Sequence, residues 1–366
     1  MRIFLRGYYG GRNVGDDALL WVMVRELDRL TPGASVRITP GIESAVPDHS
    51  LQIVRPPKGR FGPLLAAARS DLMLYGGGGV IQEYSARGSI LSNHLRLSSA
   101  ARLFRTPRVY LGVSVGPLEG PQAAERTRAI VSQATLMILR DRASLRLLDE
   151  IGADGPVHVT HDLALLLGEE PLPPRHRPER PVLGVSTNAF FQAAYRDPAR
   201  DLAVHDVIAE ALDKLMAAQP DLLVKFVCFH RGPREDLWAA QHVRERLRAP
   251  ERTTVFPHTD DPRETLAEVA ACDFLLGFRL HAAIFAYLSG VSMLALDYHP
   301  KVGGFAEMID LPDEARLPLA ELSAPALAER LTALVGGELA RARVPVAESV
   351  AAARRNFELL AGVLGR

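Results

Sequence analysis

The sequence predicts an α/β protein with two Rossmann-like domains that face a cleft, and three observations support this prediction. Short apolar runs alternate with helical patterns along the whole chain. The 366 residues exceed what one hydrophobic core usually holds. A proline-rich segment divides the chain near its middle. Near-continuous apolar runs are typical of parallel strands that helices cover on both faces, so we expect two parallel sheets.

The apolar runs predict the strands in order along the chain. In the first half they are Arg2–Arg6, Asp71–Tyr75, Arg108–Ser114, Thr135–Leu139 and Val157–Thr160. In the second half they are Val182–Thr187, Leu223–Phe229, Thr253–Phe256, Asp273–Gly277 and Ser292–Leu296. Apolar residues at spacings of three and four predict the helices. These include Asp16–Leu30, Leu145–Ile151, Ala199–Ala218, Leu280–Ser289 and a final helix over about 347–364.

The domain boundary is predicted from the segment 169–181, which contains five prolines and has no hydrophobic periodicity. Proline fixes φ and removes a backbone donor, so neither a helix nor a sheet continues through such a segment. We therefore predict an N-terminal domain over 1–168. A C-terminal domain follows over 182–340, and residues 341–366 form a helix that packs back on the first domain.

The composition excludes several classes of protein. The 43 basic residues equal the 43 acidic ones, so no net charge attracts nucleic acid. The two cysteines, Cys228 and Cys272, lie in apolar runs and are interpreted as buried hydrophobic residues. There is no HExxH motif and no cluster of Cys and His, so we expect neither a metal nor a cofactor. With no signal peptide and no run of about 18 apolar residues, we expect no transmembrane segment. The expected location is cytoplasmic, with peripheral attachment to the inner face of the membrane as an alternative.

The first candidate motif is the glycine-rich stretch Gly7–Leu20, which follows a strand and opens a helix. Such a turn lies at the carboxyl edge of a sheet, where open α/β sheets bind their ligands. Its glycine spacing is not the dinucleotide fingerprint, and no Gly-Lys-Ser/Thr follows, so neither NAD nor a Walker-type nucleotide is indicated. Asn13 and Asp16 would present polar groups at the helix start. Asp16 and Asp17 could equally serve to cap the helix.

The second motif is the run of four glycines Gly76–Gly79, again directly after an apolar strand. Glycines expose backbone amides and allow a ligand to approach the main chain closely. A close crossing of a helix over the sheet would require the same residues. Gln82 and Glu83 follow and could either hydrogen-bond sugar hydroxyls or be solvated.

Cations follow two strands of the second half. Arg279 and His281 open the helix after the strand that ends at Gly277. A helix N-terminus attracts anions through its free amides, and arginine can hold a phosphate or carboxylate bidentately. Cations at this position oppose the helix dipole, so their placement favours a functional interpretation over a structural one. Lys301, one of only four lysines, follows the next strand.

Other charged residues are less informative. Arg140 ends a strand in the first half, where it could bind an anion or form a structural ion pair. Isolated residues such as His161, His230 and Arg231 are interpreted as polar groups with partners in the fold rather than as ligands.

Taken together, the ordered motifs resemble the polysaccharide pyruvyltransferase family, in particular the branch that pyruvylates cell-wall polysaccharides. The resemblance rests on residues 7–18, the glycine turn at 76–79, residues 113–118, residues 140–144, Arg279-Leu280-His281 and residues 298–301. It implies a GT-B-like pair of Rossmann-type domains. It also implies transfer of enolpyruvate from phosphoenolpyruvate to two hydroxyls of a sugar, which yields a cyclic ketal and phosphate.

Four positions differ from the usual pattern of that family. Gly79 and Glu83 stand where Ser and Asp are usual, Asp17 stands where Glu is usual, and His299 replaces an Asp before Pro-Lys. These differences concern the choice of acceptor more than the choice of donor, because the Arg-Leu-His and lysine positions are intact.

The resemblance assigns the candidate residues to two sites, an acceptor site in the N-terminal domain and a phosphoenolpyruvate site in the C-terminal domain. The phosphoenolpyruvate site would contain Arg279, Leu280, His281, Lys301 and Arg140. The acceptor site would contain Asn13, Asp16, Gly77, Gly78, Gln82 and Glu83.

The chemistry of phosphoenolpyruvate agrees with this assignment. The donor carries a carboxylate and a phosphate, so its site must gather several cations. His281 is the candidate general acid for the methylene carbon, because imidazole titrates near neutrality. Lys301 would supply a fixed charge, or act as the acid in place of His281, and Asp16 would be the base or the orienting group for the acceptor hydroxyl.

Two alternatives stay open. A glycosyltransferase of the same fold would use a nucleotide sugar, because a fold does not settle the reaction. A sugar-binding relative without activity is the third interpretation. Whether the acceptor is linked to a lipid also stays open.

Overall fold

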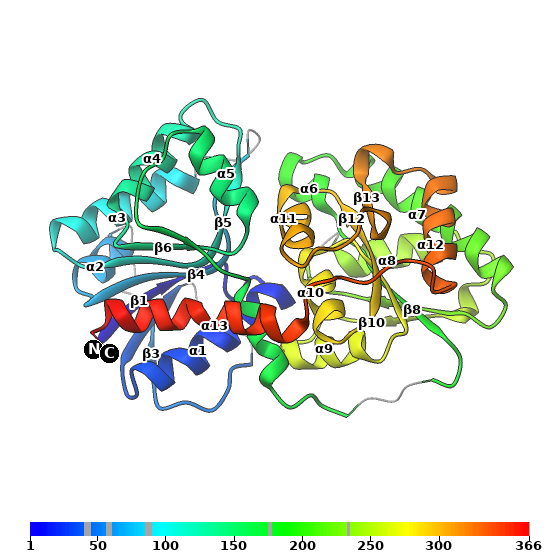
Figure 1. The fold of residues 1–366 in the computed structure, drawn as a ribbon, viewed down its shortest axis with the longest axis horizontal. Helices are drawn as coiled ribbons and strands as arrows, with labels where there is room; N and C mark the ends of the chain where they lie inside the picture. Colours follow the sequence, from blue (N-terminus) through cyan, green and yellow to red (C-terminus); the bar gives the residue numbers. More distant parts are fainter. Residues whose placement is uncertain (40–44, 56–60, 85–89, 175–177, 233–234, 366) are drawn as a thin grey trace. The chain divides into compact units, whose positions relative to one another are not determined.

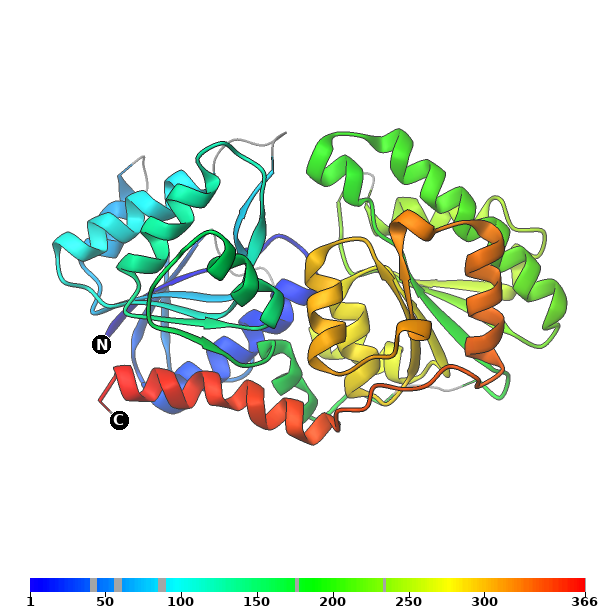
Figure 2. The same ribbon diagram turned by 45° about the horizontal axis from the view of Figure 1, so that its top comes forward.

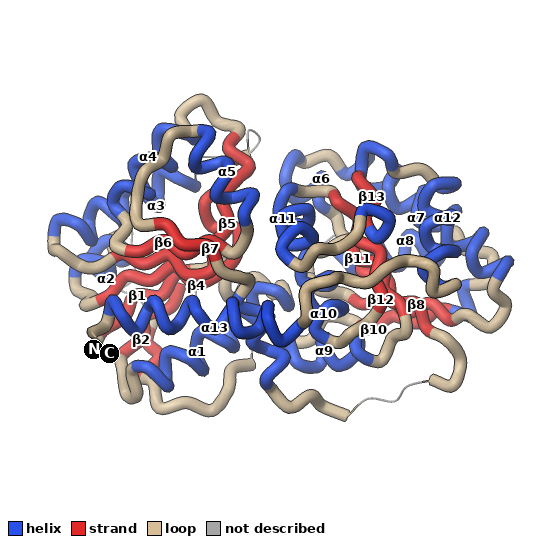
Figure 3. The backbone as a smooth tube through the Cα atoms, viewed as in Figure 1, coloured by secondary structure: helices blue, strands red, loops and turns tan. Residues whose placement is uncertain are grey.

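The computed structural model describes residues 1–39, 45–55, 61–84, 90–174, 178–232 and 235–365 (Figure 1). Contacts within the chain divide it into two compact units. Unit 1 comprises Met1–Gly11, Asp16–Leu167 and Ala347–Arg366, and unit 2 comprises Arg12–Gly15 and Gly168–Val346. Each unit contains one sheet covered by helices, as Figure 3 shows. The prediction of an α/β protein with two Rossmann-like domains is confirmed.

Unit 1 is built on a parallel sheet with the strand order β3-β2-β1-β4-β5-β6-β7. The strands are β1 (Arg2–Arg6), β2 (Ser35–Thr39), β3 (Gln52–Val54), β4 (Leu72–Glu83), β5 (Arg108–Leu118), β6 (Leu136–Leu139) and β7 (Val157–Val159). The helices are α1 (Val14–Leu30), α2 (Gly62–Ala68), α3 (Ile90–Leu103), α4 (Ala123–Gln133), α5 (Arg142–Glu150) and α13 (Val346–Val363), with a 3₁₀ segment at Leu163–Glu169. The strand order reverses between β1 and β4, and ligands of such sheets bind at this point.

Unit 2 repeats this plan with the strand order β10-β9-β8-β11-β12-β13. The strands are β8 (Val182–Ser186), β9 (Leu223–Val227), β10 (Thr253–Phe256), β11 (Phe274–Gly277), β12 (Ser292–Asp297) and β13 (Arg316–Pro318). The helices are α6 (Phe190–Tyr195), α7 (Pro198–Ala218), α8 (Asp236–Arg244), α9 (Pro262–Ala270), α10 (Leu280–Leu288), α11 (Pro300–Met308) and α12 (Ala324–Val335). Short 3₁₀ turns lie at Pro250–Arg252, Asp313–Ala315 and Leu319–Glu321. Here the order reverses between β8 and β11.

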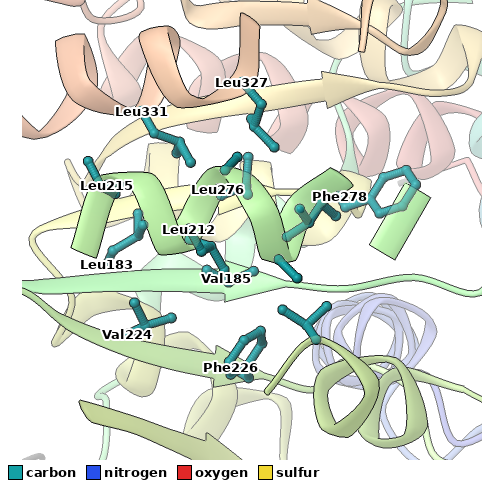
Figure 4. Close-up of a cluster of buried hydrophobic side chains, with 14 of the residues drawn as sticks. Leu183, Val185, Leu212, Leu215, Val224, Phe226, Leu276, Phe278, Leu327 and Leu331 are labelled. Atoms are coloured by element: carbon teal, nitrogen blue, oxygen red, sulfur yellow. The ribbon is translucent and has the colours of Figure 1, made fainter. Parts of the chain in front are cut away.

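The core of unit 2 shows why its strands are apolar on both faces. Leu212 and Leu215 of α7 and Leu327 of α12 belong to one buried cluster with side chains of β8 and β9 (Figure 4). Helices α9 and α10 also contact strands of this sheet. Burial on both sides removes the alternation of polar and apolar residues that a half-exposed strand would show.

The last helix belongs to unit 1, where it runs along α1 in both views of the ribbon (Figures 1 and 2). Its Ala353, Phe357 and Leu360 are buried. The Asn356 side chain donates a hydrogen bond of 3.2 Å to the carbonyl oxygen of His161. None of the described helices is both long and apolar enough to cross a membrane.

The glycine run is not the turn that the sequence predicts. Gly76–Gly79 continue strand β4, which extends to Glu83 with shifts in its register against β5. A Cβ on Gly76 would lie 2.9 Å from Met23 Cε, and one on Gly77 would lie 2.8 Å from a methyl of Leu19. Met23 and Leu19 belong to α1, so the close crossing of this helix over the sheet is what requires glycine.

Two further expectations differ from the structure. Residues 12–15 group with unit 2, although the sequence predicts that 1–168 form one domain, and unit 2 extends to 346 rather than to 340. Strands β2, β3 and β13 are missing from the prediction because they are short and alternate with polar residues. Part of the predicted linker 169–181, residues 175–177, lies outside the described residues.

Candidate functional site

The strongest candidate site lies at the carboxyl edge of the unit 2 sheet, where β8 and β11 end. Gly277 of β11 is level with Ser186 of β8. Beyond them, the Ser186 hydroxyl accepts a hydrogen bond of 2.9 Å from the backbone N–H of Phe278. The Asn188 side chain donates one of 3.3 Å to the Phe278 carbonyl oxygen. These bonds fix the backbone immediately before α10.

Arg279 is the N-cap residue of α10, and its side chain is only 14 % exposed. Its Nε donates a hydrogen bond of 2.7 Å to Oδ2 of Asp236, and its Nη2 donates a second one to Oδ1. Asp236 is fully buried at the start of α8. The predicted cation at this helix start is therefore half of a buried ion pair, which offsets its unfavourable position in the helix dipole.

Asp236 is also bonded to the backbone. Its Oδ2 accepts from the N–H groups of Phe229 at 2.8 Å and His230 at 3.2 Å, directly after β9. Burial raises the pKa of Asp236, and the Arg279 guanidinium and the backbone donor act in the opposite direction. The carboxylate therefore links the end of β9, the start of α8 and the start of α10.

A second carboxylate lies beside this pair. Glu235 Oε2 is 2.9 Å from Nδ1 of His230 and 3.8 Å from Nη2 of Arg279. The sequence predicts that His230 has a partner in the fold, and in the structure Glu235 lies within ion-pair distance of its ring. Sequence reasoning does not single out Asp236, which lies 43 positions before Arg279 and is paired with it only by the sheet topology.

His281 is the second residue of α10 and lies against the turn at residues 12–15. A Cβ on Gly15 would overlap the His281 imidazole. The N–H of Val14 donates a hydrogen bond of 2.8 Å to the Phe229 carbonyl oxygen, which connects this turn to the segment after β9. Unit 2 thus brings Arg279, His281 and the turn together at one edge of its sheet.

Asn13 belongs to this turn, which groups with unit 2. Its side-chain oxygen accepts a hydrogen bond of 2.9 Å from the N–H of Gly15, and its backbone forms an isolated bridge with His230. The observed role of Asn13 is to shape the start of α1.

Lys301 follows the neighbouring strand β12, at the second position of α11. Its Nζ lies 5.5 Å from the ring centroid of Tyr298, and that ring packs edge-on against Phe278 at 5.1 Å. Nδ1 of His299 accepts a hydrogen bond of 3.2 Å from the Lys301 N–H. His299 therefore caps α11, the role that Asp commonly has, and Nδ1 must be unprotonated to accept.

In unit 1, Asp16 lies beside the glycine segment of β4. Its Oδ1 is 3.7 Å from where a Cβ on Gly78 would lie, and Gly77 and Gly78 both have positive φ, at 72° and 84°. The buried Tyr9 hydroxyl donates to the carbonyl oxygen of Gly76. Burial, together with the Asp16 charge, raises the pKa of Tyr9. The structure therefore brings Asp16, Gly77 and Gly78 together.

Gln82 and Glu83 have different surroundings. Gln82 Nε2 lies 3.5 Å from the hydroxyl of Tyr8, which is 40 % exposed. Glu83 is buried and forms an ion pair of 3.2 Å with Arg126. Gln82 therefore lies beside a partly exposed tyrosine, where either a sugar hydroxyl or water could bind it. Glu83 instead has a partner within the protein, Arg126.

Arg140 belongs to unit 1, whereas Arg279, Leu280, His281 and Lys301 belong to unit 2. Its Nη1 donates a hydrogen bond of 2.7 Å to the Asp162 carboxylate, and its Nη2 donates one of 2.9 Å to the hydroxyl of Ser114. Of the two interpretations of Arg140, the structure shows the ion pair.

Among the described residues, no three His, Cys, Asp or Glu side chains come together as a metal would require. Both cysteines are buried thiols, and burial raises the pKa of Cys228 to about 12. A thiol of this kind is a poor nucleophile at neutral pH.

Comparisons with known proteins add two findings. A family model described as polysaccharide pyruvyl transferase matches residues 13–300. A search of curated protein sequences found no match.

Solved structures resemble the chain over nearly its full length, at low identity. A protein described as a UDP-N-acetylglucosamine 2-epimerase from Listeria monocytogenes has a TM-score of 0.68 at 12% identity, covering 100% of this chain and 96% of that one. The UDP-GlcNAc 2-epimerase from Methanocaldococcus jannaschii has a TM-score of 0.64 at 10% identity, and the match covers 98% of each chain. A glycosyltransferase from Rickettsia africae has a TM-score of 0.57 at 12% identity, and the match covers 98% of this chain and 93% of that one. At these identities the similarity concerns the fold alone, which is GT-B-like.

Proposed function

The chain belongs to the polysaccharide pyruvyl transferase family, and on this premise we propose that its donor is phosphoenolpyruvate. Enolpyruvate would be transferred to two hydroxyls of a sugar in a cell-surface polysaccharide precursor, forming a cyclic pyruvyl ketal and releasing phosphate. The observation that carries the proposal is the group of cations at the carboxyl edge of unit 2. Arg279 and His281 open α10, and Lys301 opens α11 after the adjacent strand.

This arrangement suits a small trianionic donor. The N-termini of α10 and α11 each carry a partial positive charge from the helix dipole. Arg279 adds a planar guanidinium that can bind a phosphate or carboxylate, and Lys301 adds a compact ammonium. Each of these features favours an anion, and a neutral sugar would not require so many positive groups at one site.

The proposed reaction proceeds in two additions at C2 of the donor. His281 delivers a proton to the methylene carbon while the first sugar hydroxyl adds to C2 and loses its proton to Asp16. The bond between C2 and the phosphate oxygen then breaks, and Lys301 stabilises the charge on the departing phosphate. The second hydroxyl bonds to C2 and its proton leaves with the phosphate. The balance is one donor and one diol in, one ketal and one phosphate out.

No step of this proposal uses a metal or a cofactor, since basic side chains neutralise the donor. The acceptor would be part of a cytoplasmic precursor, and a lipid-linked acceptor would place the protein at the inner face of the membrane. A glycosyltransferase that uses a nucleotide sugar is the alternative function. The epimerases and glycosyltransferases that share the fold are the reason to test it.

The test is calorimetric titration of the protein with phosphoenolpyruvate and, separately, with UDP-N-acetylglucosamine. We expect the wild-type protein to bind phosphoenolpyruvate, and to release phosphate when a suitable sugar is added. In Arg279→Ala we expect markedly weaker but still measurable binding. We expect both binding and phosphate release to be unchanged when EDTA removes divalent ions. Binding of the nucleotide sugar alone would overturn the proposal in favour of the alternative, and activity that requires a divalent ion would overturn its metal-free form.

A further inference from the structure

Asp236 is a fully buried carboxylate that the proposed chemistry does not use. Two backbone N–H groups, those of Phe229 and His230, donate to its Oδ2. The backbone after β9 therefore fixes where this carboxylate lies. A side chain paired bidentately with it has little freedom to move, because both interacting groups are planar.

The pairing uses one particular edge of the Arg279 guanidinium. Nε and Nη2 both donate to Asp236, and Nη2 also faces Glu235 at 3.8 Å. Within the described ranges of the chain, Nη1 donates no hydrogen bond to the protein. The hydrogens of Nη1 are thus the ones that remain for an anion at the N-terminus of α10.

We propose that Asp236 is a positioning residue, which holds Arg279 at the start of α10 so that Nη1 is presented to the phosphate or carboxylate of the donor. This inference rests on the proposed function for the identity of the anion. An arginine ordered before the ligand arrives spares the loss of rotamer freedom that binding would otherwise require. A buried carboxylate also prevents the guanidinium from turning its other edge toward the ligand.

The test compares Asp236→Asn with a matched control, Asp201→Asn. Asp201 is also fully buried in unit 2, and it accepts hydrogen bonds from the backbone N–H groups of Phe191 at 3.0 Å and Gln192 at 2.7 Å. Both variants remove one buried charge, but only the first frees Arg279. We expect the Kd for phosphoenolpyruvate to rise at least tenfold in Asp236→Asn and less than twofold in Asp201→Asn. Equal affinities in the two variants would overturn the inference.

A double variant tests whether Asp236 acts through Arg279. In the Arg279→Ala background, Asp236→Asn should cause no further loss and should recover some affinity, because it removes a carboxylate that has lost its partner. A further tenfold loss in that background would show that Asp236 affects the donor by another route.

A ligand-free measurement separates this inference from the proposed function. In a ¹⁵N spectrum of the arginine side chains, the Nε–H signal of Arg279, assigned by its disappearance in Arg279→Lys, should exchange slowly with solvent. It should exchange quickly in Asp236→Asn, and an unchanged signal would overturn the inference. A wild-type protein that binds no phosphoenolpyruvate would instead overturn the proposed function. If Asp236→Asn does not fold, Arg279→Lys takes its place: it cannot pair bidentately, so a wild-type Kd in that variant would overturn the inference.

Discussion

At the scale of single residues, the candidate site depends on the close packing of one glycine against one histidine. Gly15 is buried, and its Cα faces the ring of His281 so closely that a side chain has no room there. The hydrogen bond from Gly15 N–H to Asn13 holds this backbone in place. The orientation of the proposed acid is therefore determined by a residue that has no side chain of its own.

We predict that Gly15→Ala lowers kcat by about 10²–10⁴-fold, the range typical for loss of a general acid, because the added methyl must displace the imidazole. Unfolding measured by circular dichroism should show the variant folded at the assay temperature. Gly362→Ala is the control, since a Cβ there meets nothing within 4 Å. If Gly15→Ala keeps the wild-type kcat, His281 does not need its observed position.

At the scale of elements, unit 1 is closed by a contact between its first and last helices. Glu26 of α1 is 4 % exposed. Its Oε1 lies 2.8 Å from Arg25 Nε and 2.9 Å from Arg29 Nη1, and its Oε2 lies 3.7 Å from Arg354 of α13. One buried carboxylate therefore balances arginines from both helices.

We predict that Glu26→Gln lowers the free energy of unfolding by roughly 3–5 kcal/mol, since it leaves buried charge without its partner. Urea denaturation followed by circular dichroism gives this value. The control is Glu210→Gln, which breaks the exposed pair of 2.7 Å with Lys214 and should cost less than about 0.5 kcal/mol. Equal costs in the two variants would show that Glu26 does not secure α13.

At the scale of the whole molecule, each unit contains a buried histidine that folding keeps neutral. Burial lowers the pKa of His94 in unit 1 from 6.5 to about 3 and that of His205 in unit 2 to about 4. Below pH 6.5 the unfolded chain takes up protons at these positions and the folded chain does not. Their contribution to stability is therefore present above pH 6.5 and is lost as the pH falls toward the folded pKa values.

We predict that the free energy of unfolding decreases between pH 6.5 and 4, by up to about 1.4 kcal/mol per pH unit for each histidine. His94→Phe keeps a ring that can stack on Tyr75, now at 4.7 Å from the His94 ring, and should remove one histidine's share of this slope. Urea titrations at several pH values measure it. A His94→Phe slope equal to that of the wild type would contradict the prediction.

The fold class and the sheet edge where the cations lie both follow from local patterns in the amino-acid sequence. Arg2–Arg6 and Thr253–Phe256 are strands with the predicted bounds, because residues buried on both faces must be apolar wherever they pair. The positions of Arg279 and Lys301 at helix starts also follow from the sequence, since each comes directly after an apolar strand. These are local properties of the chain.

The groups that these cations contact depend on the order of the strands and on helix packing. Asp236 approaches Arg279 because β8 lies between β9 and β11, and no local pattern encodes that order. The pairing of Arg140 with Asp162 likewise depends on tertiary packing. So does the inclusion of Gly76–Gly79 in a strand that α1 crosses. Residues far apart in sequence are brought together by strand order and helix packing, and these depend on the whole set of buried contacts rather than on any one segment.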